Sequence, residues 1–186
     1  MNRALFLDRD GVVNLDEGYT HRVEQLRFVP GILDLCRAAA ARGFMLVIVT
    51  NQAGIARGRF TEAHYREFTA EMLSRLRAAG IEIAAVYHCP FHPEGIGPYR
   101  RDHAWRKPNP GMLLDAARAL GLDLKASILI GDGVRDIVAA RRAGVGTVLR
   151  IAPPQAPDRA EGAPDAVLDS VAAALAWFVP RFPDAR

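Results

Sequence analysis

The sequence predicts an α/β fold with a mostly parallel sheet and helices on both of its faces. The first observation is a rhythm that occurs four times along the 186 residues: a helical segment, a glycine, and then a short run rich in Val, Ile and Leu. The second is that these runs alternate little between apolar and polar residues, which is typical of strands buried on both faces. Strands and helices that follow one another in this way favour parallel βαβ units around one sheet.

The individual elements follow from this rhythm in chain order. The five expected strands are RALFL at 3–7, FMLVIVT at 44–50, IEIAAVY at 81–87, LDLKASILIGD at 122–132 and VGTVLRI at 145–151. The glycines before the last four stand where a left-handed residue would end each helix, at Gly43, Gly80, Gly121 and Gly144. After the fifth strand we expect a loop rich in Pro, Ala and charge at 152–164, a short edge strand in DAVLDS at 165–170 and a last helix in SVAAALAWF at 170–178.

Composition and charge favour a cytoplasmic protein with a single domain, 1–186, and a core of useful size. The net charge of +3 is too balanced to indicate a nucleic-acid partner. Asp8 interrupts the N-terminal apolar stretch too early for a signal peptide, and no apolar run is long enough to span a membrane. The two cysteines, Cys36 and Cys89, fit a reducing compartment. We expect a monomer without a nucleic-acid or membrane partner.

Polar residues stand just past the expected strands. They are Asp8 and Asp10 after the first strand, Thr50, Asn51 and Gln52 after the second, His88 and Cys89 after the third, and Gly131 and Asp132 after the fourth. Lys107 lies in RKPNPGM, directly before a helix that should begin at Pro110 with Asn109 as its N-cap. Because open parallel sheets bind ligands beyond the carboxyl ends of their strands, we expect these residues to meet at one edge.

The chemistry of this set indicates phosphoryl transfer. Asp8 and Asp10 lie on the same side of an extended chain, where two carboxylates repel each other. A Mg²⁺ ion between them and Asp132 would remove this repulsion, because Mg²⁺ prefers oxygen ligands. The Thr50 hydroxyl and the Lys107 ammonium suit phosphate oxygens. Positioning and charge neutralisation of this kind provide most of the catalysis in phosphoryl transfer.

Four segments, DRDG, TNQAGIARG, RKPNPGM and GDGVRD, resemble in this order the four motifs of the haloacid dehalogenase superfamily of phosphatases. The resemblance extends to residue 150 and implies a Rossmann-like fold. Only a flap-like stretch, 11–30, follows the first motif, which leaves no room for a separate cap domain. Within the superfamily, NLDEGYTHRVEQLRFVPG and TNQAGIARGRF resemble the subfamily of heptose bisphosphate phosphatases, which implies a sugar phosphate substrate and a place in heptose biosynthesis for lipopolysaccharide.

The resemblance also implies roles for single residues. Asp8 corresponds to the nucleophile that becomes an aspartyl-phosphate, and Asp10 to the general acid and base. Thr50 and Lys107 correspond to the residues that hold the phosphoryl group. The implied Mg²⁺ ligands are Asp8, Asp132 and the main-chain carbonyl of Asp10. The implied substrate-binding residues are Asp16, Glu17, Gly18, Tyr19, Asn51, Gln52, Ala53 and Arg106. Asp136 is expected to orient a metal-bound water or Lys107.

Two departures from the family pattern change what we expect. Close relatives hold a structural zinc with a Cys-x-His pair and a Cys-x-Cys pair, whereas here Phe91 and Trp105 occupy two of the four ligand positions. We therefore predict that structural zinc is absent and that packing of Phe91, Tyr99 and Trp105 holds this loop. The alternative is a different zinc site, built from Cys89, His92 and His103 with His88 or Asp102. Gly133 stands where some relatives have a lysine, so one substrate contact is expected to be lost.

Three other functions remain as alternatives. Histidinol-phosphate phosphatases share the four motifs but differ in the flap, where DEGY is not expected. A polynucleotide 3′-phosphatase shares TNQ and RKP, but Asp16 and Glu17 argue against the basic, aromatic groove that it would need. A module that only binds a phosphorylated ligand would have no need of Asp10 as an acid and base.

Overall fold

A computed structural model of the chain describes residues 1–153 and 163–183. The strands described there form one parallel sheet in the order β3-β2-β1-β4-β5-β6. The strands are β1 (Arg3–Leu7), β2 (Phe44–Asn51), β3 (Ala85–Cys89), β4 (Ile128–Gly131), β5 (Thr147–Ile151) and β6 (Ala166–Leu168). The predicted α/β fold is confirmed, and the short edge strand is present as β6.

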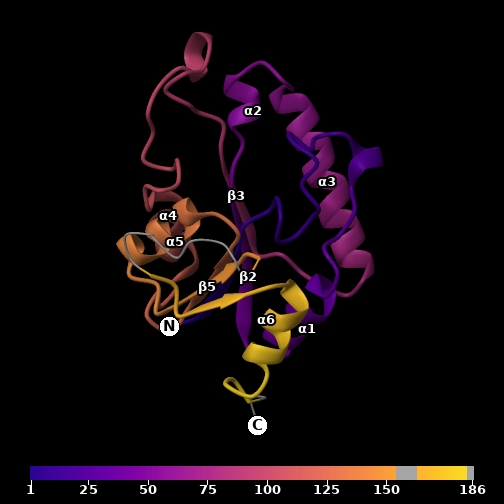
Figure 1. The fold of residues 1–186 in the computed structure, drawn as a ribbon, viewed down its shortest axis with the longest axis vertical. Helices are drawn as coiled ribbons and strands as arrows, with labels where there is room; N and C mark the ends of the chain where they lie inside the picture. The colour runs from indigo at the N-terminus through magenta and orange to yellow at the C-terminus, as the bar shows by residue number, and fades with distance from the viewer. Residues whose placement is uncertain (154–162, 184–186) are drawn as a thin grey trace.

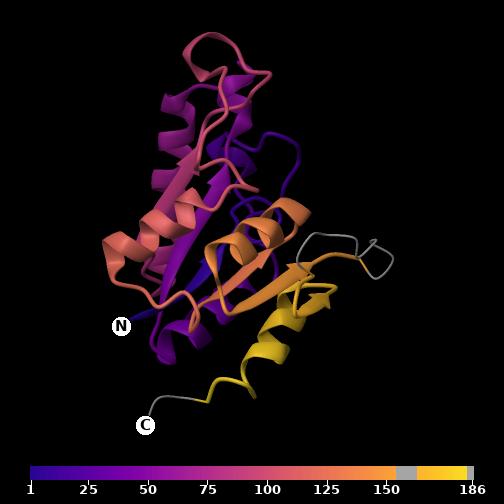
Figure 2. The same ribbon diagram turned by 90° about the vertical axis from the view of Figure 1, so that its left-hand side faces the viewer.

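Helices cover both faces of the sheet (Figures 1 and 2). The α-helices are α1 (Ile32–Ala41), α2 (Ala53–Ala56), α3 (Glu62–Ala78), α4 (Gly111–Leu120), α5 (Val134–Ala143) and α6 (Val171–Phe178). Two 3₁₀ turns, η1 (Val23–Gln25) and η2 (Gly97–Tyr99), lie in the flap and in the loop after β3. None of the helices in the described part of the chain is long and apolar enough to cross a membrane.

The central strand β1 explains why apolar residues run on without alternation. Leu5 and Leu7 point into a core shared with α1, α3 and α6, while Ala4 and Phe6 point into a second core shared with α4 and α5. All four side chains are completely buried. Successive residues of a strand face opposite sides, so a strand covered on both sides must be apolar at every position.

The predicted helix ends are confirmed at all four glycines. Gly43, Gly80, Gly121 and Gly144 have φ values of 76°, 77°, 62° and 83°. These values lie in the left-handed region, where glycine avoids the clash of a Cβ atom. The last helix is also present, as α6.

Several boundaries differ from the prediction. The strands expected from 81, 122 and 145 begin later, at Ala85, Ile128 and Thr147, and β2 includes Asn51. β3 runs to Cys89, so His88 and Cys89 lie within the strand, where they pair with Thr50 and Asn51. Helix α4 begins at Gly111, after Pro110. Asn109 does not cap it, because its side-chain amide donates to the carbonyl of His103 instead, at 3.0 Å. Gly131 closes β4 and does not follow it.

The predicted loop at 152–164 falls largely outside the described residues. On its far side the described chain resumes in the segment that leads into β6.

The packing of α6 on the sheet predicts a large effect of Phe178→Ala. Phe178 is completely buried and contacts the Phe44 ring, with the two centroids 5.5 Å apart. The cavity left by alanine should lower the free energy of unfolding by about 3–5 kcal/mol. Val179→Ala, at the exposed neighbouring position, should change it by less than about 1 kcal/mol.

Urea denaturation followed by circular dichroism measures both variants. We propose that 1–186 is one domain, which requires α6 to unfold together with the sheet. An earlier, separate transition for the C-terminal helix would contradict that proposal, as would equal effects of the two substitutions.

Candidate active site

The carboxyl ends of β1, β2 and β4 border a cavity of about 640 Å³. Most of the predicted site residues line it: Asp8, Asp10, Asp16, Gly18, Tyr19, Thr50, Asn51, Gln52, Ala53, Arg106, Lys107 and Asp132. Glu17 does not line the cavity; its side chain is exposed, and its main-chain N–H donates to Thr20 Oγ1 at 3.0 Å. The geometry thus brings most of the residues that stand near the strand ends together at one edge. His88, Cys89 and Gly131 were expected there too, but they lie within strands and do not line the cavity.

The lining also includes residues to which the sequence analysis assigned no role. They are Gly54, Arg57, Phe60 and Arg135; His92, which was named only for the alternative zinc site, also lines the cavity. Arg57 and Phe60 belong to the turn after α2, and Arg135 lies in the first turn of α5. The available signal was their position inside TNQAGIARGRF and GDGVRD, since a short segment at the sheet edge brings several consecutive side chains near the ligand.

Lys107 is a buried cation of the site, with 2% of its surface exposed. Its Nζ lies 2.9 Å from Asp8 Oδ1 and 2.5 Å from Asp136 Oδ1. It also donates to the carbonyl of Val49 at 2.8 Å. Burial alone would lower the pKa of Lys107, but the charges of Asp136 and Asp8 outweigh it and raise this pKa above its ordinary value. Of the two tasks expected for Asp136, the structure places it against Lys107.

The main chain of Lys107 is held in place by Asn51. The Asn51 amide donates to the carbonyl of Lys107 at 2.9 Å, and its Oδ1 accepts from the N–H of Lys107 at 3.0 Å. Both ends of this side chain are therefore engaged by the protein. Asn51 lines the cavity, but its contacts position Lys107.

Three carboxylates lie close together in the cavity lining. One oxygen from each of Asp8, Asp132 and Asp136 lies within 4.8 Å of the others. Burial, and then the charge of Asp136, raises the pKa of Asp8 despite the opposing effect of Lys107. The same two causes raise the pKa of Asp132 to about 6.

These carboxylates fit a divalent cation. An all-oxygen set is what Mg²⁺ prefers, and a cation there would favour the charged carboxylates that burial and crowding disfavour. The side chain of Asp10 is not part of this group, because it turns towards Arg9. Asp10 could therefore contribute only its main-chain carbonyl, as the resemblance implied.

Gly11 allows the first and fourth motifs to approach each other. Its φ is +83°, and a Cβ atom there would lie 2.2 Å from Asp132 Oδ2. Any side chain at this position would displace the Asp132 carboxylate. The glycine of DRDG is thus required by the closeness of two chain segments and by its backbone conformation.

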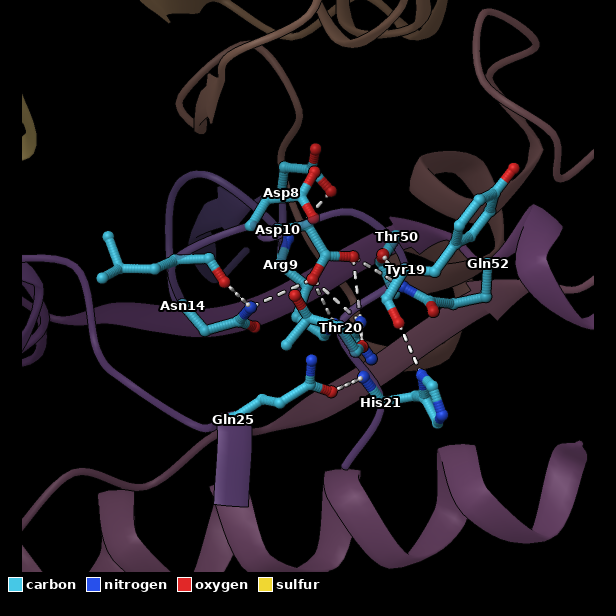
Figure 3. A network of polar contacts seen from close by, with 12 residues as sticks. Asp8, Arg9, Asp10, Asn14, Tyr19, Thr20, His21, Gln25, Thr50 and Gln52 are labelled. Atoms are coloured by element: carbon cyan, nitrogen blue, oxygen red, sulfur yellow. Dashed lines mark hydrogen bonds and ion pairs between the residues drawn. The ribbon is translucent and has the colours of Figure 1, made fainter. Parts of the chain in front are cut away.

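Gln52 connects Asp10 with Thr50 (Figure 3). Its Nε2 donates to Asp10 Oδ2 at 2.9 Å and to Thr50 Oγ1 at 2.8 Å. Gln52 is 3% exposed and Thr50 is 1% exposed. The Gln52 side chain therefore orients two residues that were assigned to catalysis.

The flap closes one side of the cavity. Asp16 Oδ1 accepts from the N–H of Gly18 at 2.9 Å, which folds the flap into a tight turn. Tyr19 follows with a φ of 56°, and its hydroxyl accepts from Arg57 Nη1 at 2.9 Å. The flap thus contacts the turn after α2.

The residues of the alternative zinc site do not form a cluster. Among the described residues, the group able to hold a metal ion is that of Asp8, Asp132 and Asp136. His92 Nδ1 accepts from the N–H of Glu94 at 3.0 Å, and His103 Nδ1 accepts from the N–H of Trp105 at 3.0 Å. The absence of structural zinc stays a prediction.

Aromatic contacts do occur along the loop after β3. The Phe91 ring stacks on His103, with centroids 4.6 Å apart, and lies 6.0 Å from the Tyr99 ring. Trp105 packs edge-on against Tyr87, and its Nε1 donates to Asp115 at 2.6 Å. These contacts agree with the predicted role of aromatic packing in this loop.

Comparisons with known proteins identify the family of this chain. Residues 104–174 match the family model described as HAD-hydrolase-like. D-glycero-alpha-D-manno-heptose-1,7-bisphosphate 7-phosphatase of Burkholderia mallei (strain ATCC 23344) is 50% identical over 151 residues, which cover 81% of this chain and 80% of that protein. D-glycero-beta-D-manno-heptose-1,7-bisphosphate 7-phosphatase of Escherichia coli (strain K12) is 44% identical over 172 residues, which cover 91% and 90%.

Two solved structures of phosphatases are also similar to this chain in fold and sequence. D,D-heptose 1,7-bisphosphate phosphatase from B. bronchiseptica, complexed with magnesium and phosphate, matches with a TM-score of 0.82 and 29% identity, covering 96% of this chain and 99% of that one. A HAD-like phosphatase from Mesorhizobium loti matches with a TM-score of 0.86 and 36% identity, covering 100% and 90%. From its identity with these relatives over most of its length, the chain belongs to the heptose 1,7-bisphosphate 7-phosphatase family of HAD-like hydrolases.

Proposed function

We propose that the protein is a Mg²⁺-dependent phosphatase that hydrolyses the 7-phosphate of D-glycero-D-manno-heptose 1,7-bisphosphate through an aspartyl-phosphate on Asp8. The observation that carries this proposal is the contact of Asp8 with the buried Lys107, 2.9 Å away, at the floor of the cavity. A fixed carboxylate beside a fixed cation suits attack on a phosphate, since the cation holds the phosphoryl oxygens while the carboxylate reaches phosphorus.

In the first step an oxygen of Asp8 attacks phosphorus. The bond from phosphorus to the sugar oxygen breaks, and Asp10 gives its proton to that oxygen. Lys107 and Thr50 hold the phosphoryl oxygens during the transfer. Asp8, Asp132 and the main-chain carbonyl of Asp10 would hold Mg²⁺, which supplies positive charge for the same oxygens when it is bound.

In the second step a water molecule attacks phosphorus in the aspartyl-phosphate. Asp10, which lost its proton in the first step, takes a proton from this water. The bond from phosphorus to the Asp8 oxygen breaks and releases inorganic phosphate. Asp8 and Asp10 return to their starting states.

Basic residues support a substrate with a second phosphate. Arg57, Arg106 and Arg135 line the cavity that contains Asp8. Guanidinium groups suit phosphate because their planar donors can bind two oxygens at once. Gly133 offers no side chain, whereas Arg135 places a cation two positions further along. We infer a role for these arginines in holding the sugar and its distal phosphate.

The enzyme is proposed to act as a cytoplasmic monomer, without a nucleic-acid or membrane partner, on the route to ADP- or GDP-heptose. Phosphate release with Mg²⁺ tests the substrate. Both anomers of the heptose bisphosphate are compared with histidinol phosphate and a 3′-phosphorylated oligonucleotide. We expect kcat/KM for one heptose anomer to exceed that of the histidinol phosphate and the oligonucleotide by about 100-fold, roughly 2.7 kcal/mol. A flat or reversed profile would contradict the substrate.

Asp8→Asn should abolish turnover, because the amide cannot form the aspartyl-phosphate. Phosphate release from the heptose bisphosphate measures the loss, and circular dichroism checks the fold. Asp34→Asn is the matched control, since the Asp34 side chain is 68% exposed and pairs with Arg37 on α1. Turnover by Asp8→Asn at the rate of the control would rule out the proposed nucleophile.

Excess EDTA, which removes the metal, should abolish turnover, and added Mg²⁺ should restore turnover. Asp132→Asn should raise the Mg²⁺ concentration for half-maximal activity by at least about tenfold, since it removes a charged ligand. A titration of activity with MgCl₂ measures this change. An unchanged midpoint in the variant would show that Asp132 is not a ligand.

A further inference from the structure

Arg9 stands between the two catalytic aspartates, and its side chain is buried, with 1% of its surface exposed. A buried cation is costly unless it is paired and hydrogen-bonded. The residue does not line the cavity, so a contact with substrate does not explain it. Its partners must therefore account for its position.

The guanidinium of Arg9 donates hydrogen bonds to the Asp10 carboxylate from two nitrogen atoms (Figure 3). Nε and Nη2 donate to Asp10 Oδ1 at 3.0 and 2.8 Å, and Nη2 also lies 2.9 Å from Oδ2. Behind it, the Phe68 ring lies 4.7 Å and the Tyr65 ring 5.9 Å from the guanidinium carbon. The rings and the carboxylate together fix the plane of the guanidinium.

Several side chains hold the Asp10 carboxylate in place, and the part of it that remains exposed faces the cavity. Its side chain is 22% exposed and lines the cavity. Asn14 Nδ2 donates to Oδ1 at 3.0 Å, and Gln52 Nε2 donates to Oδ2 at 2.9 Å. With Arg9, these donors leave the carboxylate little freedom to rotate.

The same guanidinium contacts the flap. Arg9 Nη2 donates to the carbonyl of Thr20 at 2.8 Å, and Thr20 is completely buried. Earlier in the flap, Asn14 Nδ2 donates both to Asp10 Oδ1 and to the carbonyl of Leu15, the latter at 2.9 Å. The segment 15–20 of the flap is thus connected to the Arg9–Asp10 pair directly at Thr20 and through Asn14 at Leu15.

We propose that Arg9 is a positioning residue, which aims the Asp10 carboxyl at the leaving oxygen and ties the flap to it. This inference rests on the proposed function, in which Asp10 is the general acid. A lysine would keep the charge but would lose the planar fork that orients the carboxyl group. Proton transfer depends on that orientation, because the acid must lie within hydrogen-bond reach of the oxygen.

The test compares two leaving groups in Arg9→Lys and Arg9→Ala. The sugar oxygen of the heptose bisphosphate needs a proton to leave, whereas p-nitrophenolate leaves from p-nitrophenyl phosphate without one. We expect kcat/KM to fall about 100-fold for the heptose bisphosphate and no more than about threefold for p-nitrophenyl phosphate. The ratio of the two values, taken on one sample, does not depend on the fraction of folded protein.

Arg3→Ala is the matched control. The Arg3 guanidinium also stacks on a ring, 4.1 Å from the Phe44 centroid, and donates to a main-chain carbonyl, that of Arg42. It lies outside the cavity lining, so the ratio should stay at its wild-type value. Guanidinium ion added to Arg9→Ala should restore part of the heptose activity.

Equal losses for the two substrates in the Arg9 variants, or no loss, would overturn the proposal. If the proposed substrate is wrong, the result differs, because the wild-type enzyme itself would not hydrolyse the heptose bisphosphate. In that case phenyl phosphate, whose leaving group is more basic, replaces the heptose in the comparison with p-nitrophenyl phosphate. The role of Arg9 is then tested without the proposed substrate.

Discussion

The site depends on the ion pairs of the buried Lys107 ammonium, which lies between Asp8 and Asp136. In the part of the chain that the structure describes, it is the cation that pairs with both of these buried carboxylates. Its main chain is held by Asn51 and its ammonium by the carbonyl of Val49, so β2 supplies both supports. Residues of β2 therefore hold Lys107 in the position where it pairs with Asp8, which follows β1.

Much of the fold could be predicted because burial on both faces leaves a clear pattern. The apolar runs indicated the strands, and the left-handed glycines indicated the helix ends. The start of α4 was misplaced by one residue, since Asn109 contacts the carbonyl of His103, a partner that local sequence does not reveal. The end of β3 was misplaced for a similar reason, because its pairing with β2 extends the strand to Cys89.

The sequence predicted which residues lie at the site better than it predicted the contacts that each of them makes. Asp8, Thr50 and Lys107 line one cavity as their places after strands and before a helix indicated. Asn51 and Gln52, which were predicted to bind substrate, also line the cavity, and their amides contact Lys107 and Asp10 as well, which the sequence did not indicate. Whether an amide faces a ligand or a neighbour depends on tertiary contacts, which spacing along the chain does not encode.

The strand order has a consequence for how the chain acquires its active site. β1 is made first but lies in the middle of the sheet, where Leu7 pairs with Ile48 on one side and with Ile130 on the other. During synthesis its second edge stays open until β4 has left the ribosome, and pairing over such a separation is slow. The nascent chain therefore carries Asp8 long before it carries the carboxylate of Asp132, and the proposed site is complete only late in translation.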